Sequence, residues 1–233
     1  FDFDKKICDQ NSKFPHMMPS AELFQQATRS LGINQNSTVI VFDRLGLFSS
    51  PRVWWMFKCM GFNNIAVLDG GLTSWKEAGL PVCAGQSNSI ISSGDFIAHY
   101  QPQFISDKQK VLNAIEDDHY QIIDARQEAR FLGQVAEPRA DLSSGHMPNA
   151  KSLPFSELIE SGKMRELTQL KTIYAGLLDK HKNAIFSCGS GVTACILVLG
   201  ATLCGYQHIT VYDGSWAEWG ADKQLPVVKV AQK

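Results

Sequence analysis

The chain has 233 residues, 44% of them hydrophobic, and this length suits one large domain or two modest ones. Its 22 Lys and Arg residues nearly balance 23 Asp and Glu residues, so the formal charge of -1 excludes a broad electrostatic attraction for nucleic acid or anionic lipid. The longest apolar run, residues 194–203, is about half of the roughly 20 residues that a membrane-spanning helix needs, so we expect no membrane partner.

The use of cysteine indicates a reducing compartment. The six cysteines have no CxxC spacing, and several lie in apolar helical stretches, which is typical of reduced thiols rather than of a disulfide framework or a zinc site. No signal or transit peptide is visible, and we expect a cytoplasmic location. Because the sequence opens at Phe1 within FDFD instead of at Met, we also expect that an upstream segment is absent from this molecule.

A first α/β unit is predicted over residues 1–84. A short β-branched run ends near residue 42 and a polar loop follows it; Ser50 is then expected to cap an apolar helix, with Pro51 in its first position and Gly61 at its end. A second apolar run leads to DG and a Trp-bearing helix. Residues 85–104 are the predicted linker, most clearly in the stretch GQSNSIISSG.

The second predicted unit, residues 105–233, repeats the first at an offset of 144 residues. Strands that alternate with helices of this length predict an α/β fold, with two units that are each a mainly parallel sheet flanked by helices. The second copy has an additional front section from QIIDAR through GHMPNAKSLPF to a helix near residues 167–178. The first copy is too short for an equivalent, so we expect it to lack a strand and its following loop. The matching pairs are Phe42 and Phe186, Gly61 and Gly205, Val67 and Val211, Asp69 and Asp213, Gly70 and Gly214, and Trp75 and Trp219.

The segment AIFSCGSGVTAC carries the clearest chemical signal. It places Cys188 at the carboxyl end of a predicted buried strand, where open α/β sheets bind ligands, and a glycine-rich turn then opens into a helix. Gly189 and Gly191 let backbone N–H groups converge on one point at the positive end of the helix dipole. A thiol held there is expected to ionise more readily than a free thiol, whose pKa is about 8.5. Cys188 is therefore the predicted nucleophile.

Two alternatives bear on this cysteine. A buried structural thiol is the favoured interpretation for Cys59, Cys195 and Cys204, whereas the combination of strand, Gly-x-Gly turn and helix favours chemistry at Cys188. A cysteine phosphatase needs an Arg six positions after its nucleophile, but that position is Ala194. Without this bidentate partner for phosphate, the loop favours sulfur transfer. The first copy has Arg44 at the equivalent position and cannot carry the same covalent chemistry.

The motifs CGSGVTA, RFLGQVAEPR and SSPRVWW, with the duplicated DG…W element, resemble the tandem-domain rhodanese family. The resemblance covers nearly the whole chain and is closest to the 3-mercaptopyruvate sulfurtransferases. Rhodaneses that favour thiosulfate carry basic residues in the active loop, whereas the mercaptopyruvate enzymes resemble this chain in having Gly and Ser there. The resemblance implies a catalytic second unit and a catalytically inactive first unit.

The same resemblance implies roles for individual residues. Cys188 takes sulfur from 3-mercaptopyruvate as a persulfide and releases pyruvate, with Ser190 as a second catalytic residue. Arg130 and Arg139 hold the substrate carboxylate and keto group, a task that suits the planar guanidinium, although either one could instead be a solvated surface charge. A thioredoxin-like dithiol, a small thiol or cyanide then accepts the outer sulfur, and no metal or organic cofactor is needed. The other implied substrate-binding residues are Gly189, Gly191, Val192 and Thr193.

The front of the first unit raises a difficulty. In related enzymes the serine of this loop works with an Asp and a His from the front of the first domain, which is the part expected to be missing. His16 lies too far along the chain to match that His, so the sequence predicts that Ser190 lacks these partners. Structural roles are expected for Asp124, Arg126, His146, Asp213, Trp216 and Trp219.

Two other functions remain open from the sequence. One is a thiosulfate:cyanide sulfurtransferase, which a comparison of the two sulfur donors would separate from the mercaptopyruvate enzyme. The other is a catalytically silent binding module with a rhodanese fold, which would gain no sulfur from either donor.

Overall fold

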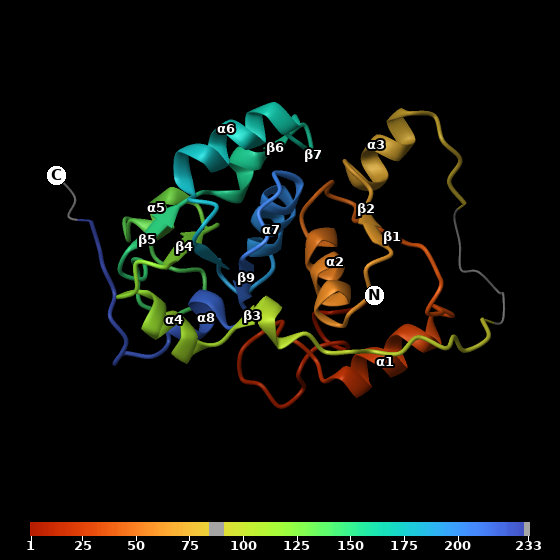
Figure 1. Ribbon diagram of the computed structural model, residues 1–233, viewed down its shortest axis with the longest axis horizontal. Coiled ribbons are helices and arrows are strands. Elements are labelled where there is room, and N and C mark those ends of the chain that lie inside the picture. The colour runs from red at the N-terminus through yellow and green to blue at the C-terminus, as the bar shows by residue number, and fades with distance from the viewer. Residues whose placement is uncertain (84–90, 231–233) are drawn as a thin grey trace.

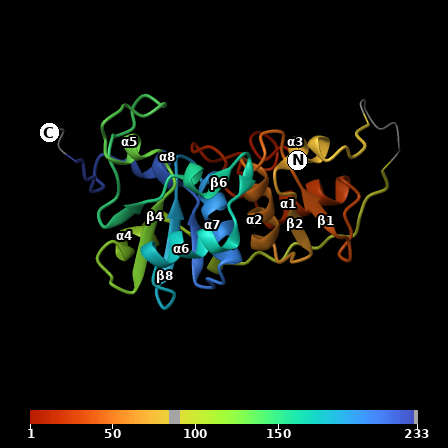
Figure 2. The ribbon, with the colours of Figure 1, turned by 90° about the horizontal axis from the view of Figure 1, so that it is seen from above.

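The computed structural model describes residues 1–83 and 91–230. Two α/β units lie side by side, and helix α2 (Ser50–Cys59) of the first unit packs against α7 (Ala194–Leu203) of the second (Figure 1, Figure 2). Within the described part of the chain, no helix is both long enough and apolar enough to cross a membrane.

A five-stranded parallel sheet forms the centre of the second unit, with strand order β3-β9-β8-β4-β5. It confirms the mainly parallel sheet predicted for this unit. The central strand β8 lies between β4 and β9, so the loop that follows β8 leaves the middle of the sheet at its carboxyl edge. The strands are β3 (Ile105–Ser106), β4 (Tyr120–Asp124), β5 (Ala150–Ser152), β8 (Asn183–Ser187) and β9 (Ile209–Tyr212).

Helices cover both faces of this sheet because successive strand side chains point to opposite faces. Phe186 packs into the core shared with α6 (Leu167–Leu177) and α7, whereas Ile185 packs into a second core with α4 (Lys108–Ala114) and α8 (Ser215–Trp219). The remaining elements are α5 (Glu128–Phe131), β6 (Ile159–Glu160), β7 (Lys163–Met164) and the short 3-10 turns η1 (Pro102–Phe104) and η2 (Phe155–Leu158).

The first unit has a parallel pair of strands, β1 (Val39–Val41) and β2 (Ile65–Val67), which correspond to β8 and β9 in the repeat. Among the described residues β1 has no strand on its other edge, whereas β8 is flanked there by β4. The side chains reflect this difference: Phe42 is 55% exposed, and its counterpart Phe186 is fully buried. The open edge lies where the sequence predicts a missing strand. The helices of the unit are α1 (Ala21–Ser30), α2 and α3 (Gly71–Glu77).

The start of α2 differs from the prediction. The cap position is Ser49, not Ser50, which is already the first helical residue, and neither serine caps the helix through its side chain. Instead Asp43 accepts the hydrogen bonds of the first amides, because the preceding loop folds back over the helix start. The predicted end of the helix is confirmed, since Gly61 follows it in the left-handed region (φ +78).

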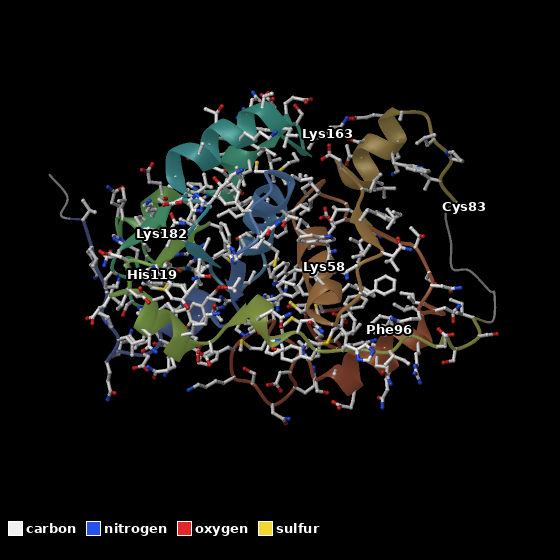
Figure 3. All side chains as sticks on the ribbon, in the orientation of Figure 1. Lys58, Cys83, Phe96, His119, Lys163 and Lys182 are labelled. Atoms are coloured by element: carbon white, nitrogen blue, oxygen red, sulfur yellow. The ribbon has the colours of Figure 1, made fainter. Side chains whose placement is uncertain are left out.

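Part of the predicted linker packs tightly on the first unit. Residues 84–90 lie outside the described chain, and residues 91–101 run without helix or strand along α1 and α2. Phe96 points into the core between these helices and is fully buried beside Phe24 and Phe57 (Figure 3). The division into residues 1–84, 85–104 and 105–233 stays a prediction.

Candidate active site

Cys188 lies where the sequence predicts it, directly after β8 and before α7. The residue is only 1% exposed, yet it lines an open cavity of about 580 Å³ at the carboxyl edge of the sheet. The cavity wall is formed by both units, so the thiol is accessible from a chamber rather than from the outer surface. Of the predicted site residues, the ones that line this cavity are Arg130, Arg139, Cys188, Gly189, Ser190, Val192 and Thr193; Gly191 lies behind the wall.

The turn after Cys188 is held from below by Ser215. Its Oγ accepts hydrogen bonds from the amides of Cys188 (3.2 Å) and Gly191 (3.1 Å) and donates one to the Tyr212 carbonyl. Gly191 has φ +75, and a Cβ there would lie 2.9 Å from the Asp213 carbonyl oxygen, so only glycine fits. The prediction that successive amides converge on the thiol is therefore only partly right, because Ser215 occupies two of them.

The equivalent loop of the first unit already binds an anion. The Asp43 carboxylate accepts hydrogen bonds from the amides of Leu45, Phe48, Ser49 and Ser50 at 2.8–3.0 Å. At the repeat offset these positions correspond to residues 189, 192, 193 and 194, whose N–H groups we call the amide cradle. In the described chain none of these four N–H groups has a hydrogen-bond partner, because Ser187 replaces Asp43. The cradle of the second unit is therefore open to an external anion.

The carboxylate in the first unit is expected to stabilise the protein in a pH-dependent way. Burial by itself raises the pKa of Asp43, but the hydrogen bonds from the amides of Ser50, Ser49 and Phe48 outweigh it, and the net pKa lies below the ordinary value. We expect Asp43→Asn to lower the free energy of unfolding near neutral pH by about 2 kcal/mol. For a chain of this size that loss corresponds to roughly 4–8 °C in Tm.

The sign of the pH dependence follows from the lowered pKa. The stabilisation is complete above the unfolded pKa of about 3.9 and is lost as the pH falls through the lower folded pKa. Thermal unfolding of the wild type and Asp43→Asn should thus converge in acid. Asp69→Asn is a matched control, since Asp69 accepts a single amide, from Met164, and its Tm should fall less. Equal Tm values for the wild type and Asp43→Asn at neutral pH would contradict this account.

His16 and Asp4 complete a hydrogen-bonded chain with Ser190. His16 Nδ1 lies 2.9 Å from Ser190 Oγ, and His16 Nε2 lies 2.7 Å from Asp4 Oδ1. The prediction that Ser190 lacks these partners is therefore wrong, as is the conclusion that His16 lies too far along the chain. The segment before α1 contacts the second unit. His16 has a left-handed backbone conformation (φ +63), and its ring faces Ser190.

A second group of charges lines the same cavity. Arg130 Nη2 donates to Glu137 Oε2 (2.5 Å), and Glu137 also accepts from Arg126, which is buried in a bidentate pair with Asp124. The guanidinium of Arg130 is close to the loop, since a Cβ on Gly189 would lie 3.5 Å from its Nη2. Sequence reasoning missed Glu137, although its place between the two arginines in RFLGQVAEPR is a signal for it.

Aromatic side chains from both units form the remaining wall of the cavity. Phe48 of the first unit meets Phe155 of the second edge to face, with ring centroids 5.9 Å apart. Phe3 packs in the same way against the His16 ring at 5.8 Å. The cavity wall thus combines arginine side chains and aromatic rings with the thiol of Cys188.

Comparisons with known proteins identify the family of this chain. A model of the rhodanese-like domain matches residues 10–78 and 107–222. The chain belongs to the rhodanese family. The 3-mercaptopyruvate sulfurtransferase of Escherichia coli is 39% identical over 225 residues, which cover 96% of this chain and 79% of that relative. The human 3-mercaptopyruvate sulfurtransferase is 36% identical over 223 residues, which cover 94% of this chain and 74% of the relative.

Solved structures agree with this assignment. The crystal structure of SseA from Escherichia coli, described as a 3-mercaptopyruvate sulfotransferase, has a TM-score of 0.82 at 37% identity and covers 93% of this rhodanese and 80% of that chain. The sulfur transferase subunit of yeast mitochondrial complex I has a TM-score of 0.89 at 34% identity and covers 98% and 83%. These likenesses confirm the expected tandem architecture and its place near the 3-mercaptopyruvate sulfurtransferases.

The other thiols of this rhodanese do not share the environment of Cys188. Burial raises the pKa of Cys195 to about 12, and it also raises the pKa of Cys59 and of Cys204. Cys83 is exposed at the outer edge of the first unit (Figure 3) and does not line the cavity. These values favour structural roles for Cys59, Cys195 and Cys204, as their apolar sequence surroundings indicate.

Proposed function

We propose that this rhodanese transfers sulfur from 3-mercaptopyruvate to a thiol acceptor through a persulfide on Cys188. The observation that carries the proposal is the open amide cradle beside a cavity-facing thiol. The same loop in the first unit binds a carboxylate with four amides, so this backbone shape is suited to a negative charge. In the second unit the charge that arrives there is the terminal sulfur of the persulfide.

Substrate binding is assigned to the two arginines of the cavity wall. Arg130 and Arg139 both line it and can bind the carboxylate and keto oxygen of mercaptopyruvate, while Glu137 fixes the direction of the Arg130 guanidinium. Because Gly189 has no side chain, Arg130 can approach the loop closely. The donor sulfur then points toward Cys188, and Val192 and Thr193 complete the surface around it.

The first chemical step breaks the carbon–sulfur bond of the donor. The Cys188 thiolate attacks the donor sulfur and forms the sulfur–sulfur bond, and the electron pair of the broken bond passes into the enolate of pyruvate. Negative charge grows on the keto oxygen, where the guanidinium groups of Arg130 and Arg139 can stabilise it. The proton of the donor thiol passes through the Ser190 hydroxyl to His16 Nδ1 and returns to the enolate carbon, so pyruvate leaves and the persulfide keeps the negative charge. His16 and Asp4 orient the Ser190 hydroxyl in this step.

The second step returns the enzyme to its thiol form. An acceptor thiolate attacks the outer sulfur of the persulfide, and the Cys188 thiolate leaves. We propose a thioredoxin-like dithiol or a small thiol as the acceptor; the second thiol of a dithiol then forms a disulfide and releases hydrogen sulfide. A cytoplasmic setting suits this chemistry, since all six cysteines are free.

The choice of donor provides the direct test. We expect kcat/KM for 3-mercaptopyruvate to exceed that for thiosulfate by about 10- to 100-fold. The reason is that the loop from residue 188 to 193 has no basic side chain for the second charge of thiosulfate, and one charged hydrogen bond contributes about 1.5–3 kcal/mol. The measurement is steady-state turnover with each donor and one common acceptor. A preference for thiosulfate would overturn the donor assignment, and the absence of an added sulfur on the protein with either donor would favour a silent binding module.

A further inference from the structure

Arg52 connects the inactive first unit to the catalytic loop of the second. It lies on the first turns of α2 and is completely buried, as is its ion pair with Asp213 at the end of β9 (Nη2 to Oδ1, 2.7 Å). Neither residue lines the cavity, so neither can touch a substrate there. A buried ion pair is costly to desolvate and is weak evidence for stability alone, so its other contacts indicate its purpose.

One side of this pair holds the segment that carries His16. Arg52 Nη2 donates to the His16 carbonyl oxygen at 2.5 Å, and Asp213 Oδ2 accepts the Met18 amide at 2.6 Å. The ion pair is therefore hydrogen-bonded to the backbone on both sides of residue 17. His16 has φ +63, a conformation that costs free energy for a residue other than glycine and persists only where neighbours hold it. Its ring consequently faces Ser190.

The other side of the pair holds the catalytic loop. Arg52 Nη1 donates to the Gly191 carbonyl at 3.4 Å, and the Asp213 backbone packs closely against Gly191. Gly191 immediately follows Ser190. The same ion pair thus contacts the backbone at or next to both members of the His16–Ser190 hydrogen bond, one from each unit.

We propose that Arg52 is a positioning residue that sets the distance and angle between His16 and Ser190, and that this is a task of the inactive first unit. The proposal rests on the sulfurtransfer function given above. The geometry requires an arginine, because a guanidinium can donate to Asp213, His16 and Gly191 at once. A lysine ammonium keeps the charge opposite Asp213 but cannot reach all three acceptors in one plane.

The test is a double-mutant cycle on the rate of sulfur transfer to Cys188 in a single turnover, read as the protein mass gained from 3-mercaptopyruvate. Arg52→Lys should lower this rate by about 10- to 100-fold, the cost of a small misplacement of a catalytic group. In the His16→Asn background, Arg52→Lys should lower it by less than about 3-fold, because the group that it positions is already gone. A merely structural role would give equal effects in the two backgrounds.

One control and one substitute variant keep the test decisive. Arg29→Lys removes a guanidinium-to-carbonyl contact, Arg29 Nε to Phe96 O at 2.7 Å, within the first unit and away from the loop. It should leave the transfer rate unchanged. If Arg52→Lys does not fold, Arg52→Gln combined with Asp213→Asn replaces the ion pair by neutral amides and enters the same cycle.

The possible failures are distinguishable. If Arg52→Lys transfers sulfur as fast as the wild type, or if its effect is undiminished in the His16→Asn background, the positioning role is overturned while the sulfurtransfer function stands. If the wild-type protein itself gains no sulfur, it is the proposed function that fails.

Discussion

A Cys188→Ser variant is expected to fold like the wild type and to lose sulfur transfer by more than about 10³-fold, with no sulfur added to the protein after exposure to 3-mercaptopyruvate. The loop keeps its hydrogen bonds, because Ser215 Oγ accepts them from the backbone amides of residue 188 and Gly191. It cannot form a stable persulfide, and removal of a covalent nucleophile leaves only binding and electrostatic effects. Turnover assays and intact-protein mass measure the two losses separately.

The matched control is Cys83→Ser, which removes an exposed thiol that does not line the cavity. It should retain full turnover and still gain one sulfur atom. If Cys188→Ser keeps the added sulfur while Cys83→Ser loses it, the sulfur carrier is Cys83 and the assignment to Cys188 is wrong. The two variants also test accessibility. If exposure rather than the amide cradle decided reactivity, the exposed Cys83 thiol would be the one that gains sulfur.

The local features of this protein follow from its sequence because each depends on contiguous residues. The strand, Gly-x-Gly turn and helix around Cys188 form as the spacing indicates. The repeat predicts the paired architecture, since equal spacing of the same residue types produces the same supersecondary unit twice. Arg130 and Arg139 reach the cavity because α5 and the loop after it follow the carboxyl end of β4.

What the sequence did not predict are contacts between the units. His16 and Ser190 are 174 positions apart, and distance along the chain does not limit distance in space once two units pack together. The family resemblance led us to expect this His at the front of the first unit, and the segment before α1 supplies it as His16. The role of Asp43 was missed for a different reason. Its carboxylate binds the amides of the first unit's loop, whereas the equivalent amides of the second unit are free in the described chain, and only the hydrogen bonds of the folded chain show this.

Replacement of His16 is the second change with a large expected effect. We expect His16→Asn to lower the single-turnover rate of sulfur transfer by about 10²- to 10³-fold, because proton transfer through a positioned group typically contributes 10²–10⁴. Asparagine is the suitable substitute, since it tolerates the left-handed backbone at this position better than other side chains do. Loss of the imidazole then leaves the Ser190 hydroxyl without its proton acceptor while the chain path is kept.

Asp4→Asn separates the contribution of the third member. The Asp4 side chain is 57% exposed, so water screens its pairing with His16, and the rate should fall by no more than about 10-fold. We expect a smaller loss of rate for Asp4→Asn than for His16→Asn because the Asp4 side chain is exposed. A relay in which every member is indispensable would give equal losses of rate for the two variants. An unchanged rate in His16→Asn, with Cys188→Ser inactive, would mean that the thiolate and the arginines alone cleave the donor. In that case the first unit would act through shape and not through proton transfer.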